Sequence, residues 1–432
     1  MSSTFLWLAA STGFISLLTP CVFPMVPVTI AYFSSPGHRH SAGLRGVTLF
    51  GLGIISTFTL LGLVLAAIFG AAGLNRFAAN PWVNIALAIV FVFFAATLFG
   101  WIDLTISWRM LSAADRAART AEDSSLGALI MGATFTLTSV TCTAPFVGTL
   151  LVLAARGSWM MPIFGMVVYS TAFALPFVLL ALVPRSVARL PRSGEWIRTL
   201  RVLIGLLELG AAVRFVANAD LVLNWGIFTR TVVLAVWMVL ALLGAAYVAV
   251  GVARNASRGE FAGGRLAASA GALLIAAWLA TGLRGKPLRQ VEAFLPPRTP
   301  AVALGAIGSA TPKWLFNDYE GALDTARKSG RLVFLDFTGY TCTNCRWMEA
   351  NIFSRPDVES QLARFVLARL YTDGEGPIYE RQQAFQEKTF GTVALPLYAV
   401  VDADGKVRGT FTGLTRDPAE FIAFLRRAAV GG

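Results

Sequence analysis

The sequence has 432 residues, of which 56% are hydrophobic and only 14% are charged, with a mean hydropathy of +0.65. Soluble globular chains carry about 25% charged residues, so these values exclude a protein built for water alone. The net charge of +12 does not indicate nucleic acid, because the Arg residues fall in short loops between apolar segments. We therefore expect a membrane protein that contacts the lipid bilayer and binds no nucleic acid.

Eight apolar segments approach or exceed the length of about 20 residues that a helix needs to cross a bilayer. The predicted spans are 12–34, 46–73, 81–103, 126–154, 160–183, 199–217, 231–252 and 266–283. The sixth is the weakest, because it is short and contains Glu208. An acid inside a membrane is a functional candidate by default, but here we favour a structural acid with a satisfied partner.

The loop charges predict how these spans are oriented. When Arg201 and Arg214, near the two ends of the sixth span, are counted with the adjoining loops, the odd-numbered loops carry thirteen Arg residues and the even-numbered loops carry four. Positive charge favours the cytoplasmic side, so both termini are expected to face outward. The uncharged N-terminal tail agrees with this orientation. It also lacks a basic n-region, so we do not expect a cleaved signal peptide.

A weak internal repeat lies in the first and fourth spans. TPCVFP (19–24) and TCTAP (141–145) each place a cysteine three residues before a proline, as Cys21 with Pro24 and Cys142 with Pro145. The two motifs are three spans apart and so run in opposite directions, which is the layout of an inverted repeat. The prolines free backbone groups that need protein or water as partners, which makes a water-accessible cavity plausible. A Cys21–Cys142 disulfide is favoured over two inert thiols.

The composition changes after the eighth span. Residues 285–311 are basic and contain prolines, which predicts a linker between a membrane domain (1–284) and a soluble α/β domain (312–432). Strands are expected at 331–338 and 365–372 and as a pair within 397–413, with helices at about 317–329, 343–354 and 417–428. The fold class is therefore an all-α polytopic membrane domain followed by a small α/β domain.

The motif CTNC (342–345) follows a strand and opens a helix, which is the thioredoxin arrangement. The positive end of a helix and its free N–H groups stabilise a thiolate there. Cys342 is then the exposed nucleophile and Cys345 the resolving thiol. Half of a zinc site is the alternative, but a structural zinc needs about four ligands, and no His or further Cys lies in this domain.

Three further residues are candidates for supporting roles. Pro396 precedes a strand, and in thioredoxin-like folds a cis proline at that point lies beside the CxxC motif. Asp336 lies on the strand that leads to the motif, and Glu349 lies one helical turn after Cys345. Acids near the thiols would raise the thiol pKa and could pass protons during exchange. Ordinary surface charge remains the alternative, more so for Glu349 than for Asp336.

Taken together, several segments resemble the thiol:disulfide interchange protein DsbD family, and the membrane part also resembles the CcdA proteins. These segments are TPCVFPMVPVTI, TCTAP, ALPFVLL (174–180), PRSGEW (191–196) and FLDFTGYTCTNCRWME (334–349). The resemblance implies a protein-disulfide reductase of the bacterial inner membrane, acting in processes such as cytochrome c-type biogenesis, with a periplasmic thioredoxin-like domain.

The resemblance also implies a route for electrons. Cytoplasmic thioredoxin would reduce a Cys21–Cys142 pair, which would reduce the Cys342–Cys345 pair, and electrons would leave for periplasmic disulfide-containing proteins. Asp336 and Glu349 match the acids that tune the family's C-terminal domain. No cofactor is implied beyond the redox-active disulfides.

The sequence departs from the family pattern in two places. Two residues separate Cys142 from Pro145, where the best-known members have three, so the local geometry is expected to differ. The family's immunoglobulin-like N-terminal domain does not precede the first span. We therefore expect a separate protein as the final carrier, or direct action of the C-terminal domain on substrates.

Two other functions remain open. A membrane transporter with a redox-regulatory domain would fit the inverted repeat equally well, but it gives no reason for cysteines at both symmetric positions. An oxidase with reversed electron flow is the second, although the sequence holds no evident quinone or haem site.

Overall fold

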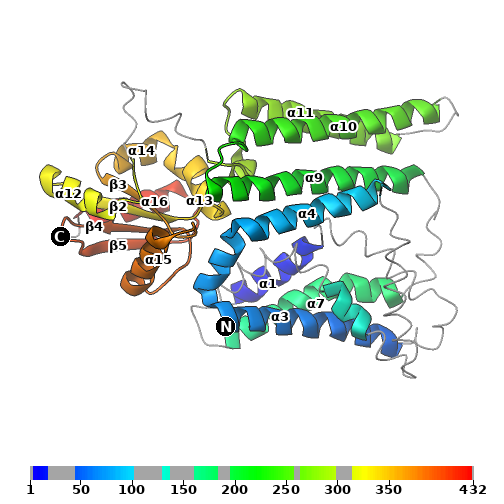
Figure 1. The fold of residues 1–432 in the computed structure, drawn as a ribbon, viewed down its shortest axis with the longest axis horizontal. Coiled ribbons are helices and arrows are strands. Elements are labelled where there is room, and N and C mark those ends of the chain that lie inside the picture. The colour runs from blue at the N-terminus through cyan, green and yellow to red at the C-terminus, as the bar shows by residue number, and fades with distance from the viewer. Residues whose placement is uncertain are drawn as a thin grey trace. The chain divides into compact units, whose positions relative to one another are not determined.

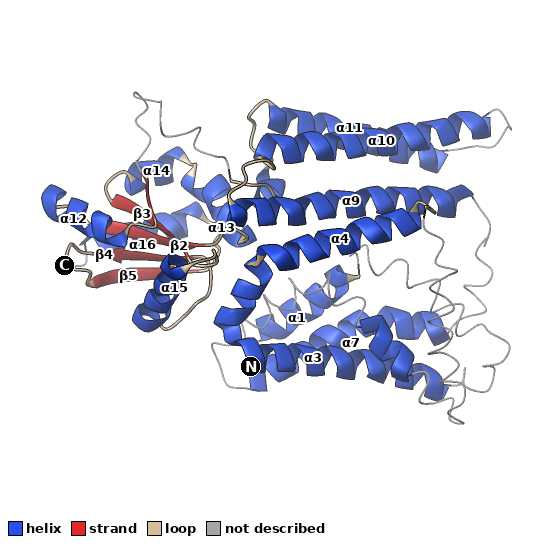
Figure 2. Ribbon diagram, viewed as in Figure 1, coloured by secondary structure: helices blue, strands red, loops and turns tan. Residues whose placement is uncertain are grey.

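A computed structural model describes residues 3–17, 44–101, 129–136, 160–182, 195–256, 263–297 and 314–430. The chain divides into two compact units, one formed by Met1–Leu74 and Ile89–Leu209 and the other by Asn75–Ala88 and Gly210–Gly432. In its described parts the first unit is helical, as Figure 2 shows. Its helices are α1 (Ser3–Ser16), most of α3 (Leu44–Ala79), the second half of α4 (Pro81–Leu98), α7 (Met160–Leu182) and the start of α9 (Glu195–Leu223).

An aromatic cluster forms the core of the first unit. The ring of Phe58 packs edge-on against the rings of Tyr169 and Phe173, with centroids 5.9 and 5.1 Å away. Phe135 and Phe177 extend the cluster with a centroid distance of 4.7 Å. All five side chains are almost completely buried. Aromatic pairs in this geometry contribute beyond the area that they bury, so they help to hold α3 and α7 together.

Small residues allow the helices of this unit to approach closely. A Cβ atom at Gly13 of α1 would lie 2.5 Å from the carbonyl oxygen of Tyr169 in α7. The hydroxyl of Tyr169 donates to Oγ of Ser16 at 2.9 Å, which joins the same two helices. Gly53 of α3 and Gly132 show the same kind of contact between another pair of helical segments. Such small-residue interfaces and interhelical hydrogen bonds are typical of helices packed in a membrane.

Four helices in the described residues are long and apolar enough to cross a membrane, at Gly46–Val64, Pro81–Leu98, Arg230–Ala253 and Leu266–Leu283. They fall within or closely match four of the eight spans predicted from sequence. A shorter apolar helix, Ile163–Leu179, lies in a fifth. The protein is therefore a multi-pass membrane protein, while the count of eight spans stays a prediction.

Glu208 lies in α9, which covers the weakest of the predicted spans. Its side chain is fully buried, and neither carboxyl oxygen has a hydrogen-bond partner among the described residues. We expected a satisfied structural acid, and the described part of the chain supplies no such partner.

In the second unit, α10 (Arg230–Ala256) and α11 (Gly263–Leu283) pack along each other. A short 3₁₀ helix, η3 (Arg289–Phe294), follows α11 within the expected linker. Its flanking residues Leu288 and Leu295 are about 99% buried, in a cluster with Leu234 of α10 and Leu279 of α11. The first part of the expected linker is thus packed against membrane helices.

The C-terminal domain contains a five-stranded sheet in the order β1-β3-β2-β4-β5. The strands are β1 (Trp314–Phe316), β2 (Val333–Thr338), β3 (Val366–Tyr371), β4 (Leu397–Val401) and β5 (Val407–Thr412). The first three are parallel, and β4 and β5 are antiparallel to their neighbours. β2, β3 and β4 read as nearly continuous apolar runs because both faces of the sheet are covered.

Helices cover both faces of this sheet, as Figures 1 and 2 show. One face packs on α12 (Tyr319–Ser329) and α15 (Pro377–Phe390), and the other on α13 (Thr343–Met348), a π-helical turn η4 (Glu349–Phe353), α14 (Pro356–Leu362) and α16 (Pro418–Val430). The predicted strands and three predicted helices are present, with ends shifted by a few residues. The helix expected at 343–354 is α13 continued by η4. β1, α14 and α15 were not predicted.

Candidate functional site

The two cysteines of the CTNC motif form a disulfide at the start of α13. Their Cα atoms are 5.3 Å apart, and Cys342 occupies the N-cap position of the helix. The backbone N–H of Cys345 donates to Sγ of Cys342 at 3.1 Å. A helix N-terminus leaves such N–H groups without partners of their own, so they are free to stabilise charge on the first sulfur.

The two sulfurs differ in their access to solvent. Cys345 is 1% exposed, whereas Cys342 is partly exposed. An incoming thiolate can therefore reach Cys342 and not Cys345. This arrangement fits the expectation that Cys342 makes the contact with partners and Cys345 closes the ring again.

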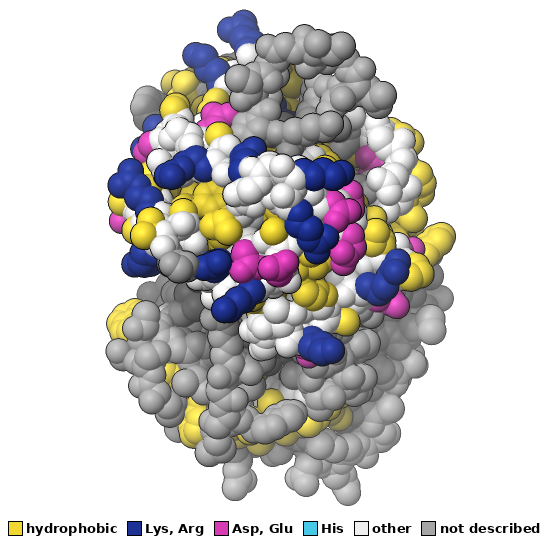
Figure 3. Space-filling model, turned by 90° about the vertical axis from the view of Figure 1, so that its left-hand side faces the viewer, with side chains coloured by type: hydrophobic (Ala, Val, Ile, Leu, Met, Phe, Trp, Pro, Cys, Tyr) yellow, Lys and Arg dark blue, Asp and Glu magenta, His cyan; other side chains and the backbone are white. Residues whose placement is uncertain are grey.

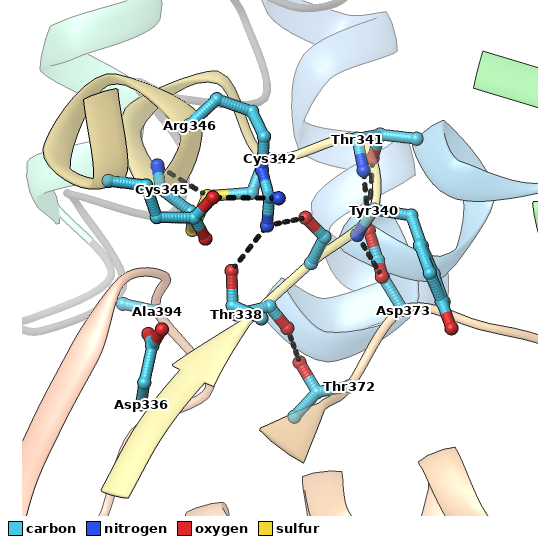
Figure 4. The surroundings of a disulfide bond; sticks show 12 residues. Asp336, Thr338, Tyr340, Thr341, Cys342, Cys345, Arg346, Thr372, Asp373 and Ala394 are labelled. Atoms are coloured by element: carbon cyan, nitrogen blue, oxygen red, sulfur yellow. Dashed lines mark hydrogen bonds and ion pairs between the residues drawn. A yellow bond between two sulfur atoms is a disulfide. The ribbon is translucent and has the colours of Figure 1, made fainter. Parts of the chain in front are cut away.

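Asp336 projects from β2 beneath this disulfide, as Figure 4 shows. It is 1% exposed, and Nε of Arg369 on β3 donates to its Oδ2 at 2.7 Å. Burial raises the pKa of Asp336 from 3.8 to about 6, although the Arg369 guanidinium opposes the shift. A carboxyl with this pKa can take up and release a proton near neutral pH.

Glu349 is the second acid, and it lies in η4, one turn beyond Cys345. It forms an ion pair with Nη1 of Arg346 at 2.8 Å and a longer one with Nη1 of Arg369 at 3.4 Å. The alternative of ordinary surface charge does not hold for Glu349, because its side chain is only 17% exposed and both partners are largely buried. The two acids and two arginines thus form one buried network below the disulfide.

Arg346 links the helix to the end of β2. Its Nη2 donates to Oγ1 of Thr338 at 3.0 Å and to the carbonyl of Gly339 at 3.3 Å. The side chain is almost completely buried although it directly follows the second cysteine. A charge so far from water needs such partners, and here they fix the position of α13 on the sheet.

Asp373 holds the loop that precedes the motif. Its carboxylate accepts from the backbone N–H groups of Tyr340 and Thr341 at 2.7 and 3.1 Å, and from the Thr341 hydroxyl at 3.1 Å. A Cβ atom at Gly339 would lie 2.5 Å from Oδ2 of Asp373, so the close approach requires glycine. Burial raises the pKa of Asp373, and these donors oppose the rise.

The Leu395–Pro396 peptide bond is cis, as expected. Ala394, two residues earlier, is drawn among the surroundings of the disulfide in Figure 4. The structure therefore places Cys342, Cys345, Asp336, Glu349 and the segment before Pro396 in one domain. The other predicted site residues, Cys21, Pro24, Cys142 and Pro145, lie outside the described residues.

Sequence reasoning missed Arg346, Arg369 and Asp373. The pairing of β2 with β3 is the signal that could have revealed Arg369 and Asp373. It sets Asp336 opposite Arg369 and brings the end of β3 to the CxxC loop. Arg346 had no such signal, because a basic residue in the first turn of a helix is usually exposed.

Two families match the sequence. The family described as the cytochrome C biogenesis protein transmembrane domain matches residues 3–219, and the thioredoxin-like domain matches residues 319–429. Similar curated proteins are the thiol:disulfide interchange proteins DsbD of Pseudomonas fluorescens, DsbD 1 of Pseudomonas aeruginosa and DsbD of Pectobacterium atrosepticum, at 29, 29 and 28% identity.

The matched regions cover 83, 90 and 93% of this chain and 60, 64 and 65% of the three relatives. The chain thus spans less than two thirds of their length. Among solved structures, a thioredoxin from Thermus thermophilus is 28% identical, with a TM-score of 0.25, and the match covers 28% of this chain and 91% of that one.

Proposed function

Because the chain belongs to the DsbD family, with its cytochrome c biogenesis transmembrane domain followed by a thioredoxin-like domain, we propose that it carries electrons across the bacterial inner membrane. The proposed donor is cytoplasmic thioredoxin, and the proposed acceptors are periplasmic disulfide-containing proteins. Electrons pass first through Cys21 and Cys142 and then through Cys342 and Cys345.

The first exchange reduces the Cys342–Cys345 disulfide. A thiolate of the membrane pair attacks Sγ of Cys342, the S–S bond breaks, and Cys345 leaves as a thiolate that takes up a proton. The second membrane thiol then attacks the mixed disulfide and releases Cys342. The membrane pair is oxidised to a disulfide, and the CxxC pair gains two electrons and two protons.

The second exchange passes these electrons on. The Cys342 thiolate attacks a partner disulfide, one partner sulfur leaves as a thiol, and Cys345 then attacks Sγ of Cys342. This closes the Cys342–Cys345 disulfide and releases the partner with two thiols. In this proposal Asp336, whose pKa burial raises to about 6, accepts and returns the proton of Cys345.

One observation carries the proposal, namely the unequal access to the two sulfurs. Cys342 is partly exposed and accepts an N–H of the helix end, whereas Cys345 is buried behind it. A pair that meets external partners and then resolves the mixed disulfide needs this order.

On the face shown in Figure 3, Lys and Arg side chains lie among Asp, Glu and hydrophobic side chains. We define the proposed acceptors by their disulfide chemistry alone.

Trapping in cells tests the proposal. A Cys345→Ser variant keeps the attacking thiol but cannot resolve the mixed disulfide, so periplasmic partners should accumulate in dithiothreitol-sensitive adducts. The Cys342→Ser/Cys345→Ser variant is the control and should form none. Adducts of equal yield in both variants, or adducts with cytoplasmic proteins only, would contradict the proposal.

A further inference from the structure

The segment between the last membrane helix and the thioredoxin-like domain contacts the helix that carries the CxxC motif. Nε1 of Trp347, in α13, donates to Oε1 of Gln290, in η3, at 2.9 Å. Nδ2 of Asn351, in η4, donates to the carbonyl oxygen of Arg289 at 3.4 Å and to that of Trp347 at 3.0 Å. Two consecutive residues of η3 therefore bind the helical turn that follows the cysteines.

A buried ion pair anchors this segment to the membrane helices. Arg230, at the start of α10, contacts both carboxyl oxygens of Glu292, through Nε at 2.8 Å and Nη2 at 3.2 Å. Nη1 of Arg230 also donates to the carbonyl of Gly282 at the end of α11. Glu292 is 6% exposed and accepts from the backbone N–H of Leu288 at 3.0 Å. A two-point arginine–carboxylate contact fixes direction as well as distance.

Close packing adds to this anchor. Leu288 is almost fully buried, and a Cβ atom at Gly282 would lie 2.6 Å from its Cδ1. The missing side chain at Gly282 is what lets Leu288 pack against the end of α11. The membrane helices thus hold η3 in place independently of its contact with α13.

The backbone at the start of η3 is also held in an unusual conformation. Arg289 has φ +47°, a region that residues other than glycine rarely adopt. Such a conformation persists where the surroundings impose it, often at places where a ligand is gripped. Here Leu288 is buried, while the carbonyl oxygen of Arg289 and the side chain of Gln290 accept hydrogen bonds from Asn351 and Trp347.

We propose that residues 285–295 are a docking platform for α13 and η4 of the same chain, which holds the thioredoxin-like domain at the ends of α10 and α11 between rounds of exchange. Its use in electron transfer rests on the proposed function, whereas the contact itself does not. Because both partners belong to one chain, even a weak contact of this kind is well populated.

Docking on the platform leaves the rest of the domain surface for other partners. Trp347 and Asn351 lie beyond the second cysteine, while Tyr340 and Thr341 lie before the first. A partner protein that uses the Tyr340 side and the Pro396 segment need not displace η3. The domain can therefore stay docked, or leave the platform, without a change in its fold.

Photo-cross-linking in the full-length, membrane-embedded protein tests the platform. Arg289, whose side chain is exposed, is replaced by p-benzoylphenylalanine, and a protease site is inserted at 301–306. After irradiation and cleavage, we expect the two fragments to stay joined, with the cross-link mapping to residues 343–353. The matched control places the same amino acid at Leu266, exposed at the other end of α11 and about 25 Å along the helix from Leu283.

A Trp347→Phe variant separates the specific contact from mere proximity. It keeps a ring but lacks the N–H that Gln290 accepts, so the cross-linking yield should fall about two- to tenfold, as expected for the loss of one hydrogen bond. Yields from Arg289 that equal those from Leu266, or that do not respond to Trp347→Phe, would overturn the platform.

Measuring the cross-linking yield in the Cys342→Ser/Cys345→Ser background distinguishes docking from electron transfer. Cross-linking should be retained there, because neither sulfur takes part in the contact with η3. If cross-linking is seen but the membrane cysteines prove dispensable for reducing Cys342–Cys345, the platform stands and the proposed route fails. If the route holds and no cross-link forms, the platform is wrong.

Discussion

Nε of Arg369 lies 2.7 Å from Oδ2 of Asp336, so a carboxyl that is 1% exposed has a cation directly beside it. The two residues sit opposite each other in the parallel pairing of β3 with β2. Burial nevertheless outweighs the ion pair and raises the pKa of Asp336 to about 6. Asp336 is thus the group beneath the disulfide whose protonation changes near neutral pH.

The first prediction concerns stability against pH. Between pH 4 and 6 an unfolded chain has lost the proton of Asp336, while the folded domain still holds it. The folded state therefore binds more protons, and the free energy of unfolding should fall as pH rises through this window, on the order of 1–3 kcal/mol. Urea unfolding of the oxidised domain 312–432 measures it. Asp336→Asn is the control and should lose this component; an unchanged slope would refute the assignment.

The second prediction concerns Arg346. Arg346→Met removes a buried cation and, among the described residues, leaves Glu349 paired with Arg369 alone at the longer distance, so we expect a loss of about 2–4 kcal/mol in unfolding free energy. Arg355→Met is matched to it, because Arg355 also pairs with a carboxylate, Asp357, but both are about half exposed. That variant should change the free energy of unfolding far less than Arg346→Met does, because solvent screens an exposed pair. Equal effects would mean that the buried network does not hold α13.

The third prediction concerns the two thiols of the reduced domain. The thiol of a free cysteine has a pKa of about 8.5. Cys342 should be alkylated by iodoacetamide well below that pH, because its thiolate lies at a helix N-terminus. Cys345 should react far more slowly, since it is 1% exposed. Peptide mass spectrometry after timed alkylation distinguishes them. Faster labelling of Cys345 would reverse their roles.

The fourth prediction concerns topology. The excess of Arg in the odd-numbered loops predicts that the thioredoxin-like domain lies in the periplasm. Alkaline phosphatase fused after Gly432 should therefore be active, and a fluorescent protein that matures only in the cytoplasm should be dark. The opposite pair of results would reverse the orientation and the direction of the relay.

Local signals in the sequence predicted much of the C-terminal domain. A CxxC between a strand and a helix, and Asp336 on that strand, needed only short-range patterns, and both are where they were expected. Arg369 and Asp373 depend on which strands pair, which is long-range information. β1 has only three residues, too few to show a pattern.

The linker shows a second limit of sequence reasoning. Its prolines and basic residues predicted a linker between two domains, but Leu288, Glu292 and Leu295 are buried against α10 and α11. Their burial depends on Arg230, about sixty residues earlier, and on the absence of a side chain at Gly282. Neither partner can be recognised from the segment alone.

Electrons are proposed to reach Cys342 and Cys345 through the membrane cysteines. The most direct measurement is the redox state of the Cys342–Cys345 pair in cells that carry Cys21→Ala, read by acid quenching and maleimide gel shift. In this variant the pair should accumulate as the disulfide, whereas the unsubstituted chain should keep it largely reduced. A pair that stays reduced in the Cys21→Ala variant would show that electrons arrive by another route and would contradict the relay.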